Sequence, residues 1–254
     1  MDSRPPKSNE LRSHDVLLPP AHTFYVMAES PCPYLPGQQE RKLFTELRPQ
    51  DAGGFYAELS RGGFRRSHNF AYRPACTGCT SCVPVRIDAR AFKAGRSLRR
   101  VSRLNAELTA RERQARATTE QYRIFSRYIT TRHSEGEMAS MAFSDYRSMI
   151  EESVLDTRVI EFRGAEGELV AGLLVDWSAD GASAVYSFFD PALAQRSLGS
   201  FMVLWLIEEC QRRDLPYVYL GYWIEGSRKM SYKDRFRPLQ ALGPDGWQDL
   251  PLGR

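Results

Sequence analysis

The pattern of apolar and polar positions predicts a strand-rich C-terminal part. Apolar runs of strand length lie at 158–163, 169–177 and 182–189, with hairpin-type turns at 164–168 and 179–181. A loop at 190–196 leads into an apolar helix predicted over 198–213, and a buried strand is predicted at 216–222. Hairpins followed by a loop, a helix and another strand indicate an α+β fold.

The middle of the chain has the helical period of apolar positions. One helix is predicted over 99–117 and a second over 119–131. A third is predicted from 144 to about 153, with Ser144 as its N-cap residue.

The N-terminal part has a weaker pattern. Strands are predicted at 22–27, 55–59 and 83–88, and helical turns at 40–47. Residues 1–20 are polar and rich in proline, and we expect a disordered tail there. The predicted regions are therefore a tail at 1–20, a cysteine-containing region at 21–98, a helical region at 99–155 and a C-terminal α+β region at 156–254.

The element order of the C-terminal region is similar to that of a GNAT-like acyltransferase core, a similarity that concerns fold and not activity. Acetyltransferases that use CoA carry a glycine-rich turn before the corresponding helix. In 196–201, Arg196 and Gly199 fit that turn, but Phe201 stands where a glycine or alanine belongs. This weakens the CoA hypothesis, and the sequence contains no P-loop, G-x-S-x-G or H-E-x-x-H motif.

Composition and charge narrow the class of protein. No apolar stretch reaches the roughly 18 residues of a membrane span, and the N-terminus has no apolar signal core. We therefore expect a cytoplasmic protein with reduced thiols. The net charge is +4, but basic residues far outnumber acidic ones between 61 and 116, where aromatic residues are interleaved with them. This mixture favours a polyanion-binding surface over an ordinary solvated face.

The cysteines are concentrated in one segment. Cys76, Cys79 and Cys82 lie within seven residues, and Cys32 lies upstream in a proline-rich loop. Zinc and iron–sulfur clusters both require four ligands, and Cys32 could complete such a set. Redox-active thiols and simple packing are the alternatives, and packing is the expectation for Cys210 on its apolar helix.

The block at 219–233 directly follows a predicted strand and combines tyrosines, a glycine and basic residues. Side chains that converge at a strand end are typical of a site. Lys229 and Lys233 are four residues apart and could face the same way on a helical turn, to hold a phosphate or stabilise negative charge. The alternative is a basic helix above packed tyrosines.

Several segments together resemble the bacterial aspartate/glutamate leucyltransferases, which are aminoacyl-tRNA–protein transferases related to the eukaryotic arginyl-tRNA–protein transferases. The resemblance covers nearly the whole chain after residue 20. The matching segments are 31–37, Glu40-Arg41, 63–67, 72–74 with the three cysteines, Arg86-Ile87, Phe92, 96–100, 186–191, 197–199, 219–233 and 236–238. Ser227 departs from the family, where cysteine stands in many relatives.

The resemblance implies transfer of leucine from leucyl-tRNA to the N-terminal α-amino group of proteins that begin with Asp or Glu, which marks them for degradation. It also implies a pair of GNAT-like halves, the first with the cysteine-containing, acceptor-recognising segment. No cofactor is required for the reaction. Eukaryotic relatives carry an iron–sulfur cluster on N-terminal cysteines, so iron–sulfur or zinc on Cys32, Cys76, Cys79 and Cys82 is a possible addition.

The roles expected of single residues follow from that reaction. An aminoacyl ester is already activated, so the enzyme must position the amine, accept a proton and stabilise an oxyanion. Candidate residues for catalysis are Tyr222, Lys229 and Tyr232. The acceptor's carboxylate calls for arginine, with Arg65, Arg66, Arg73 and Arg86 as candidates. The tRNA backbone calls for basic surface, with Arg99, Arg100, Arg228 and Lys233 as candidates. Asp176, Asp190 and Glu225 are the candidate bases. A CoA-dependent N-acetyltransferase and a zinc-containing nucleic-acid-binding module are the alternative functions.

Overall fold

The computed structural model describes residues 21–132, 137–227 and 230–251. The predicted tail at 1–20 lies outside the described residues. No helix in the described ranges has the length and apolar character needed to cross a bilayer.

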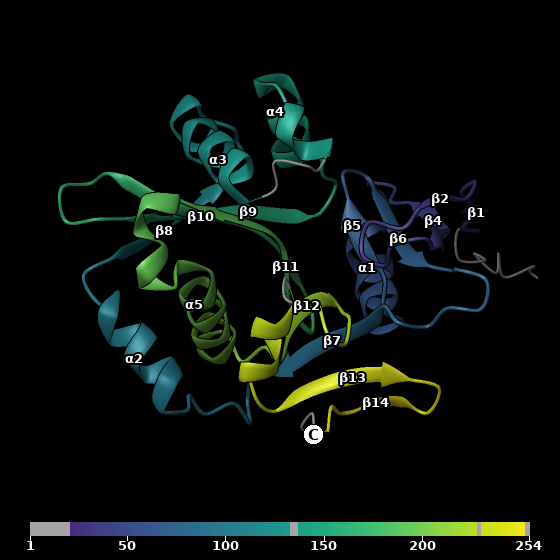
Figure 1. The fold of residues 1–254 in the computed structure, drawn as a ribbon. Helices are drawn as coiled ribbons and strands as arrows, with labels where there is room; N and C mark the ends of the chain where they lie inside the picture. The colour runs from purple at the N-terminus through teal and green to yellow at the C-terminus, as the bar shows by residue number, and fades with distance from the viewer. Residues whose placement is uncertain (1–20, 133–136, 228–229, 252–254) are drawn as a thin grey trace, which may run out of the picture.

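The C-terminal part is built on one large mixed sheet (Figure 1), which has eight strands within the described residues. Their order across the sheet is β14 (Gly246–Asp249), β13 (Leu239–Gly243), β7 (Val83–Asp88), β12 (Tyr217–Trp223), β11 (Gly181–Phe189), β10 (Leu169–Ser178), β9 (Asp156–Arg163) and β8 (Thr109–Gln114). Neighbouring strands are antiparallel except β11 and β12, which are parallel and joined through helix α5 (Leu198–Arg212).

Helices cover both faces of this sheet. Helix α5 and helix α2 (Arg96–Leu104) lie on one face, and helix α3 (Thr119–Arg132) and helix α4 (Phe143–Glu151) lie on the other (Figure 1). The first face buries residues such as Leu98, Leu204 and Ile207, and the second buries Phe125 and Tyr146. Burial of such side chains provides the main stabilisation of the layers.

The N-terminal part forms its own sheet, with the order β1 (Phe24–Val26), β4 (Lys42–Glu46), β6 (Phe70–Pro74) and β5 (Arg65–Ser67). Helix α1 (Ala52–Arg61) packs on it through a separate apolar cluster that contains Tyr56 and Leu59. A short pair, β2 (Ser30–Pro31) and β3 (Gln39–Glu40), extends from it. Strand β7 connects the two parts, because it follows the cysteine segment in sequence and pairs with β12 and β13 of the large sheet.

The α+β class and the predicted C-terminal elements are confirmed. The hairpins β9–β10–β11, the apolar helix α5 and the strand β12 occur in the predicted order, and α3 and β7 also lie where the pattern places them. The division into regions at residues 98 and 155 stays a prediction.

Several N-terminal and middle elements were predicted wrongly. Residues 55–59 belong to helix α1, because Ala52, Tyr56, Leu59 and Ser60 are buried at helical and not at alternating spacing. Residues 42–46 form strand β4, which pairs with β1 and β6.

The long helix predicted over 99–117 ends at Leu104, and the later residues form edge strand β8 against β9. The N-cap residue of α4 is Ala142 and not Ser144; the carboxylate of Asp145 accepts a hydrogen bond from the backbone N–H of Ala142 at 2.8 Å. Pairing with β9 decided the local structure of β8, and the hydrogen bond to Asp145 fixes the start of α4.

Candidate active site

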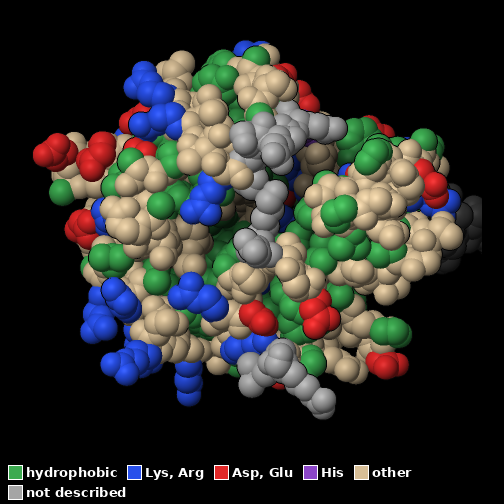
Figure 2. Space-filling view, viewed as in Figure 1, with side chains coloured by type: hydrophobic (Ala, Val, Ile, Leu, Met, Phe, Trp, Pro, Cys, Tyr) green, Lys and Arg blue, Asp and Glu red, His purple; other side chains and the backbone are tan. Residues whose placement is uncertain are grey.

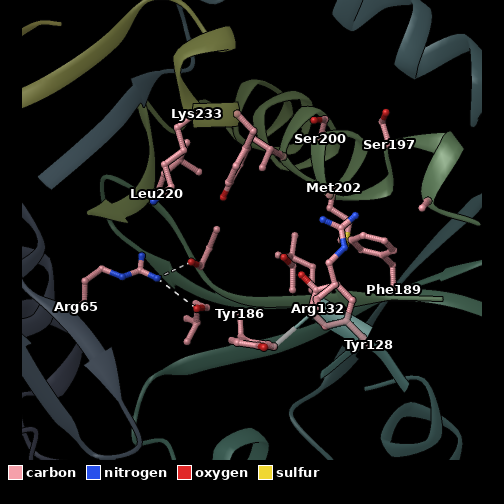
Figure 3. Close-up of a pocket in the computed structure, with 18 residues that line it drawn as sticks. Arg65, Tyr128, Arg132, Tyr186, Phe189, Ser197, Ser200, Met202, Leu220 and Lys233 are labelled. Carbon is pink, nitrogen blue, oxygen red and sulfur yellow. Dashed lines mark hydrogen bonds between the residues drawn. The ribbon is translucent and has the colours of Figure 1, made fainter. Parts of the chain in front are cut away.

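Strands β11 and β12 pair only at their beginnings and then separate. Their parallel register joins 181–183 to 217–219, whereas the strands continue to Phe189 and Trp223. Beside the N-terminus of α5, the separation leaves a cavity of about 520 Å³ (Figure 3). Side chains from eight helices and strands line this cavity, which makes it the candidate active site.

Two cations satisfy backbone carbonyls that the separated strands leave unpaired. The Arg65 guanidinium donates to the carbonyls of Ala184 at 2.7 Å and Val185 at 3.3 Å, and to the Ser183 hydroxyl at 3.2 Å. The Lys233 ammonium donates to the carbonyl of Tyr222. Because buried carbonyls need partners, these contacts hold both side chains against the cavity wall.

Lys233 has an unusual environment for a lysine. It belongs to the short helix η3 (Ser231–Arg235), and only 6% of its surface is exposed. Burial, together with the nearby charge of Arg65, lowers the pKa of Lys233 to about 7. A large fraction is therefore neutral near pH 7 and able to accept a proton. The structure thus places Lys233 inside the cavity, whereas the sequence assigned it to a tRNA-binding surface.

Gly221 makes the approach of Arg65 possible. Its φ of +75° lies in the left-handed region, and a Cβ atom there would come 2.8 Å from Nε of Arg65. Only glycine combines this conformation with free space for the arginine. The glycine in the 219–233 block is therefore a positional requirement of the cavity.

The wall between the cationic groups is apolar. Leu173, Met202, Val203 and Leu220 line it, and Tyr232 is a further lining residue. Tyr232 is 38% exposed as a residue, but the loss of water around its hydroxyl raises the pKa of that group. No Asp or Glu is among the cavity-lining residues that the structure describes. The cavity thus suits an aliphatic side chain next to an anionic or carbonyl group.

Arg132 stands at the opposite end of the cavity from Lys233 (Figure 3). It is the last residue of α3, and its guanidinium carbon lies 5.4 Å from the centroid of the Phe189 ring. Sequence reasoning missed this residue, because an arginine in the last turn of a helix is an ordinary feature.

A basic depression adjoins the cavity. It has a volume of about 850 Å³ and is lined by Arg96, Arg100 and Arg103 of α2 and by Arg235 of η3. Ser197 lines both the depression and the cavity, so the two lie side by side. Figure 2 shows lysine and arginine side chains gathered at the lower left, where Figure 1 places α2. None of the ion pairs found among the described residues involves these four arginines.

Arg99, also predicted to contact tRNA, is exposed but does not line the depression, and it donates to the Ala94 carbonyl at 2.6 Å. Arg228, predicted to contact tRNA, and Lys229, predicted to act in catalysis, lie outside the described residues.

Arg66 and Asp176 form a buried pair and do not reach the cavity. The guanidinium donates to both carboxylate oxygens, at 2.6 and 3.0 Å, and neither side chain is more than 1% exposed. Thr157 donates a further hydrogen bond to Asp176 at 2.6 Å. Arg66 therefore has no exposed donor for an acceptor carboxylate, and Asp176 is enclosed too completely to serve as the base.

Two other predicted arginines also lie away from the cavity. Arg86 is buried between the rings of Tyr217 and Trp247, 3.5 and 4.4 Å from their centroids, and donates to Gln240 at 2.9 Å. Arg73 lines a separate cavity of about 960 Å³. Its guanidinium lies over the Phe64 ring, with 5.6 Å between the guanidinium carbon and the ring centroid.

Tyr222 joins the two parts of the protein and does not line the candidate active site. Its hydroxyl lies 3.1 Å from the carbonyls of both Gly63 and Tyr72, and burial raises its pKa. Of the remaining candidate bases, Asp190 pairs with Arg127 at 3.0 Å and Glu225 is exposed. Neither is a lining residue of the cavity.

The cysteine segment lies on the wall of the cavity that contains Arg73. Cys76, Cys79 and Cys82 line it, and all cysteines in the described ranges are free thiols. Burial and the neighbouring thiols raise the pKa of Cys82 to about 11, whereas a hydrogen bond with Ser81 lowers that of Cys79. Within the described residues, no group of three Cys, His, Asp or Glu side chains has the arrangement of a metal site. Cys32, Cys76 and Cys79 all lie close enough to Cys82 to raise its pKa, and a metal or cluster on these four cysteines stays a prediction.

Comparisons with known proteins identify similar sequences over most of the chain. A family described as "Arginine-tRNA-protein transferase, N terminus" matches residues 30–100, and one described as "Arginine-tRNA-protein transferase, C terminus" matches residues 120–243. The chain is 58% identical to the aspartate/glutamate leucyltransferase of Paramagnetospirillum magneticum, covering 91% of this chain and 95% of the relative. It is 55% identical to that of Rhodospirillum rubrum, covering 89% and 92%.

Among solved structures, L-PGS from Bacillus licheniformis matches 68% of this chain and 52% of its own, with a TM-score of 0.45 and 14% identity.

Proposed function

Because this chain belongs to the aspartate/glutamate leucyltransferase family, we propose that it transfers leucine from leucyl-tRNA to the N-terminal α-amino group of proteins that begin with Asp or Glu. The modified proteins then carry a signal for degradation. Both substrates, the charged tRNA and the protein, are found in the cytoplasm, and we place the activity there.

One observation carries the proposal: a cavity with an aliphatic wall and a buried lysine lies beside a basic depression. The leucyl side chain matches the wall formed by Leu173, Met202, Val203 and Leu220. The tRNA phosphates match the arginines of the depression. The cavity and the depression together provide places for both parts of an aminoacyl-tRNA.

The reaction requires little beyond positioning and proton transfer. The α-amine nitrogen attacks the ester carbonyl carbon, and a tetrahedral oxyanion forms. The ester C–O bond then breaks, a peptide bond remains, and the 3′-terminal ribose oxygen leaves and takes up a proton. The amine loses one proton in this sequence, so the active site needs a group that accepts it and passes it on.

Lys233 fits the role of that group. One N–H donates to the Tyr222 carbonyl and fixes the amine, while the neutral form keeps a lone pair. Its pKa of about 7 suits both acceptance of the proton from the amine and its return to the ribose oxygen. Arg65 contributes positive charge beside it and fixes the position of β11. No step passes through the cysteines.

The proposed binding of leucyl-tRNA to the basic depression can be tested by substitution of one of its arginines. Arg100→Ala is expected to raise the KM for leucyl-tRNA and to reduce the slope of log(kcat/KM) against log[salt] by about one, because a phosphate contact is lost. The measurement is steady-state transfer at several salt concentrations. Arg90→Ala is the control, since Arg90 pairs with Asp214 and does not line the depression. If both substitutions have an equal effect, the depression does not bind leucyl-tRNA.

The activity itself is tested by a transfer assay. Labelled leucine is expected to pass from leucyl-tRNA to a peptide that begins with Asp or Glu, and not to the same peptide beginning with Ala. Arginyl-tRNA and acetyl-CoA serve as competing donors in parallel reactions. Labelling from acetyl-CoA but not from leucyl-tRNA would contradict the proposal.

A further inference from the structure

The cavity must also recognise the acidic side chain of the acceptor, and most of the arginines suggested by the sequence are already engaged. Arg66 is paired with Asp176 inside the protein. Arg73 and Arg86 do not line the cavity. Arg65 lines it, but its terminal nitrogens donate to Ser183 and to backbone carbonyls of β11.

Arg132 differs from these arginines in its contacts. It lines the cavity, is exposed, and shows no ion pair with a carboxylate whose side chain the structure describes. Its guanidinium carbon lies 5.4 Å from the centroid of the Phe189 ring, a cation–π contact that restrains the position of the group. A guanidinium held in this way can bind a carboxylate through two parallel hydrogen bonds.

The position of Arg132 also fits the geometry of an N-terminal acidic residue. The α-amine must lie near Lys233, and the side-chain carboxylate of the same residue extends away from it. Figure 3 shows Lys233 and Arg65 at one end of the cavity and Arg132 at the other. Arg132 ends α3 and is exposed. Its flexible stem can therefore follow both Asp and Glu, which differ by one methylene.

We infer that Arg132 is the residue that selects acceptors with an acidic N-terminal side chain, an inference that rests on the proposed function. The absence of Asp and Glu among the described lining residues supports this, because no nearby carboxylate competes for the guanidinium or repels the acceptor. An N-terminal lysine or arginine would meet like charge at the same place, which adds rejection to recognition.

The test compares peptides that differ only in their first residue, Asp or the uncharged isostere Asn. The native protein is expected to favour Asp. Arg132→Met keeps an apolar stem over Phe189 and is expected to reduce the Asp-to-Asn ratio of kcat/KM by about tenfold or more, since a charge-assisted pair is lost. The KM for leucyl-tRNA should not change. Arg132→Glu is expected to invert the preference toward a peptide that begins with Lys.

Arg123→Met is the matched control, because Arg123 lies on the same helix and does not line the cavity; its ratio should equal that of the native protein. An unchanged ratio in Arg132→Met, or a higher KM for leucyl-tRNA with the ratio preserved, overturns the inference. Titration calorimetry with the same two peptides measures the Asp-to-Asn ratio of binding affinities in the absence of leucyl-tRNA. A failure of leucine transfer would therefore contradict the proposed function, while the binding ratio would still decide the role of Arg132.

Discussion

Replacement of Lys233 by methionine is expected to lower kcat for leucyl transfer by about 100-fold or more, the usual contribution of a positioned acid–base group. Methionine has a similar length and suits the buried environment of a side chain that is 6% exposed. The apolar wall and the basic depression do not depend on the lysine. The KM for leucyl-tRNA should therefore change little, and steady-state kinetics with saturating acceptor separate the two quantities.

The pH dependence identifies the role of Lys233 more specifically than the loss of rate. Below its pKa of about 7, the lysine is protonated and cannot accept a proton. The kcat of the native protein should therefore fall as the pH drops below about 7 and reach a plateau above it. The methionine variant should lack this inflection, whereas the titration of the acceptor's own amine, near pH 8, should persist.

Lys93→Met provides the control, because Lys93 is exposed and does not line the cavity. It should retain native kcat and the native pH profile. If Lys233→Met keeps the inflection near pH 7 despite a normal melting temperature, another group accepts the proton.

The sequence predicted the fold best where burial alone determines an element. Strand β10 and helix α5 contain long apolar runs, and β9, β10 and β11 are interior strands of the large sheet. The pattern placed each of these elements within a few residues. Strand β8 could not be recognised, because it is a polar edge strand whose structure depends on pairing with β9. Helix α1 was mistaken for a strand because five residues are too few to separate the two periods.

The candidate site was predictable only in part, because its geometry depends on tertiary contacts. Arg65 and Lys233 lie in segments that stood out in the sequence, but their surroundings depend on where β11 and β12 separate. The low pKa of Lys233 comes from burial beneath tertiary neighbours, which no local pattern records. Arg132 gave no signal at all, because its position in the cavity depends on how α3 crosses the sheet.

Replacement of Arg66 by methionine is expected to cost about 3 to 5 kcal/mol of unfolding free energy, as is usual when one partner of a buried ion pair is removed. Asp176 would keep its hydrogen bond from Thr157 but lose both bonds from the guanidinium. Its charge would then remain in an environment with no exposure to water. The pair also joins β5 of the N-terminal sheet to β10 of the large sheet, so both sheets should unfold at a lower denaturant concentration.

The controls distinguish the buried charge from the loss of an arginine as such. Arg90→Met removes an exposed pair with Asp214, in which the side chains are 56% and 87% exposed, and should cost no more than about 1 kcal/mol. In the double variant Arg66→Met with Asp176→Leu, no unpaired charge remains, so much of the stability should return. Urea unfolding, followed by circular dichroism, measures the free energy of unfolding of the native protein, the two single variants and the double variant. If the double variant is as unstable as Arg66→Met, the loss comes from altered packing between the sheets and not from the isolated carboxylate.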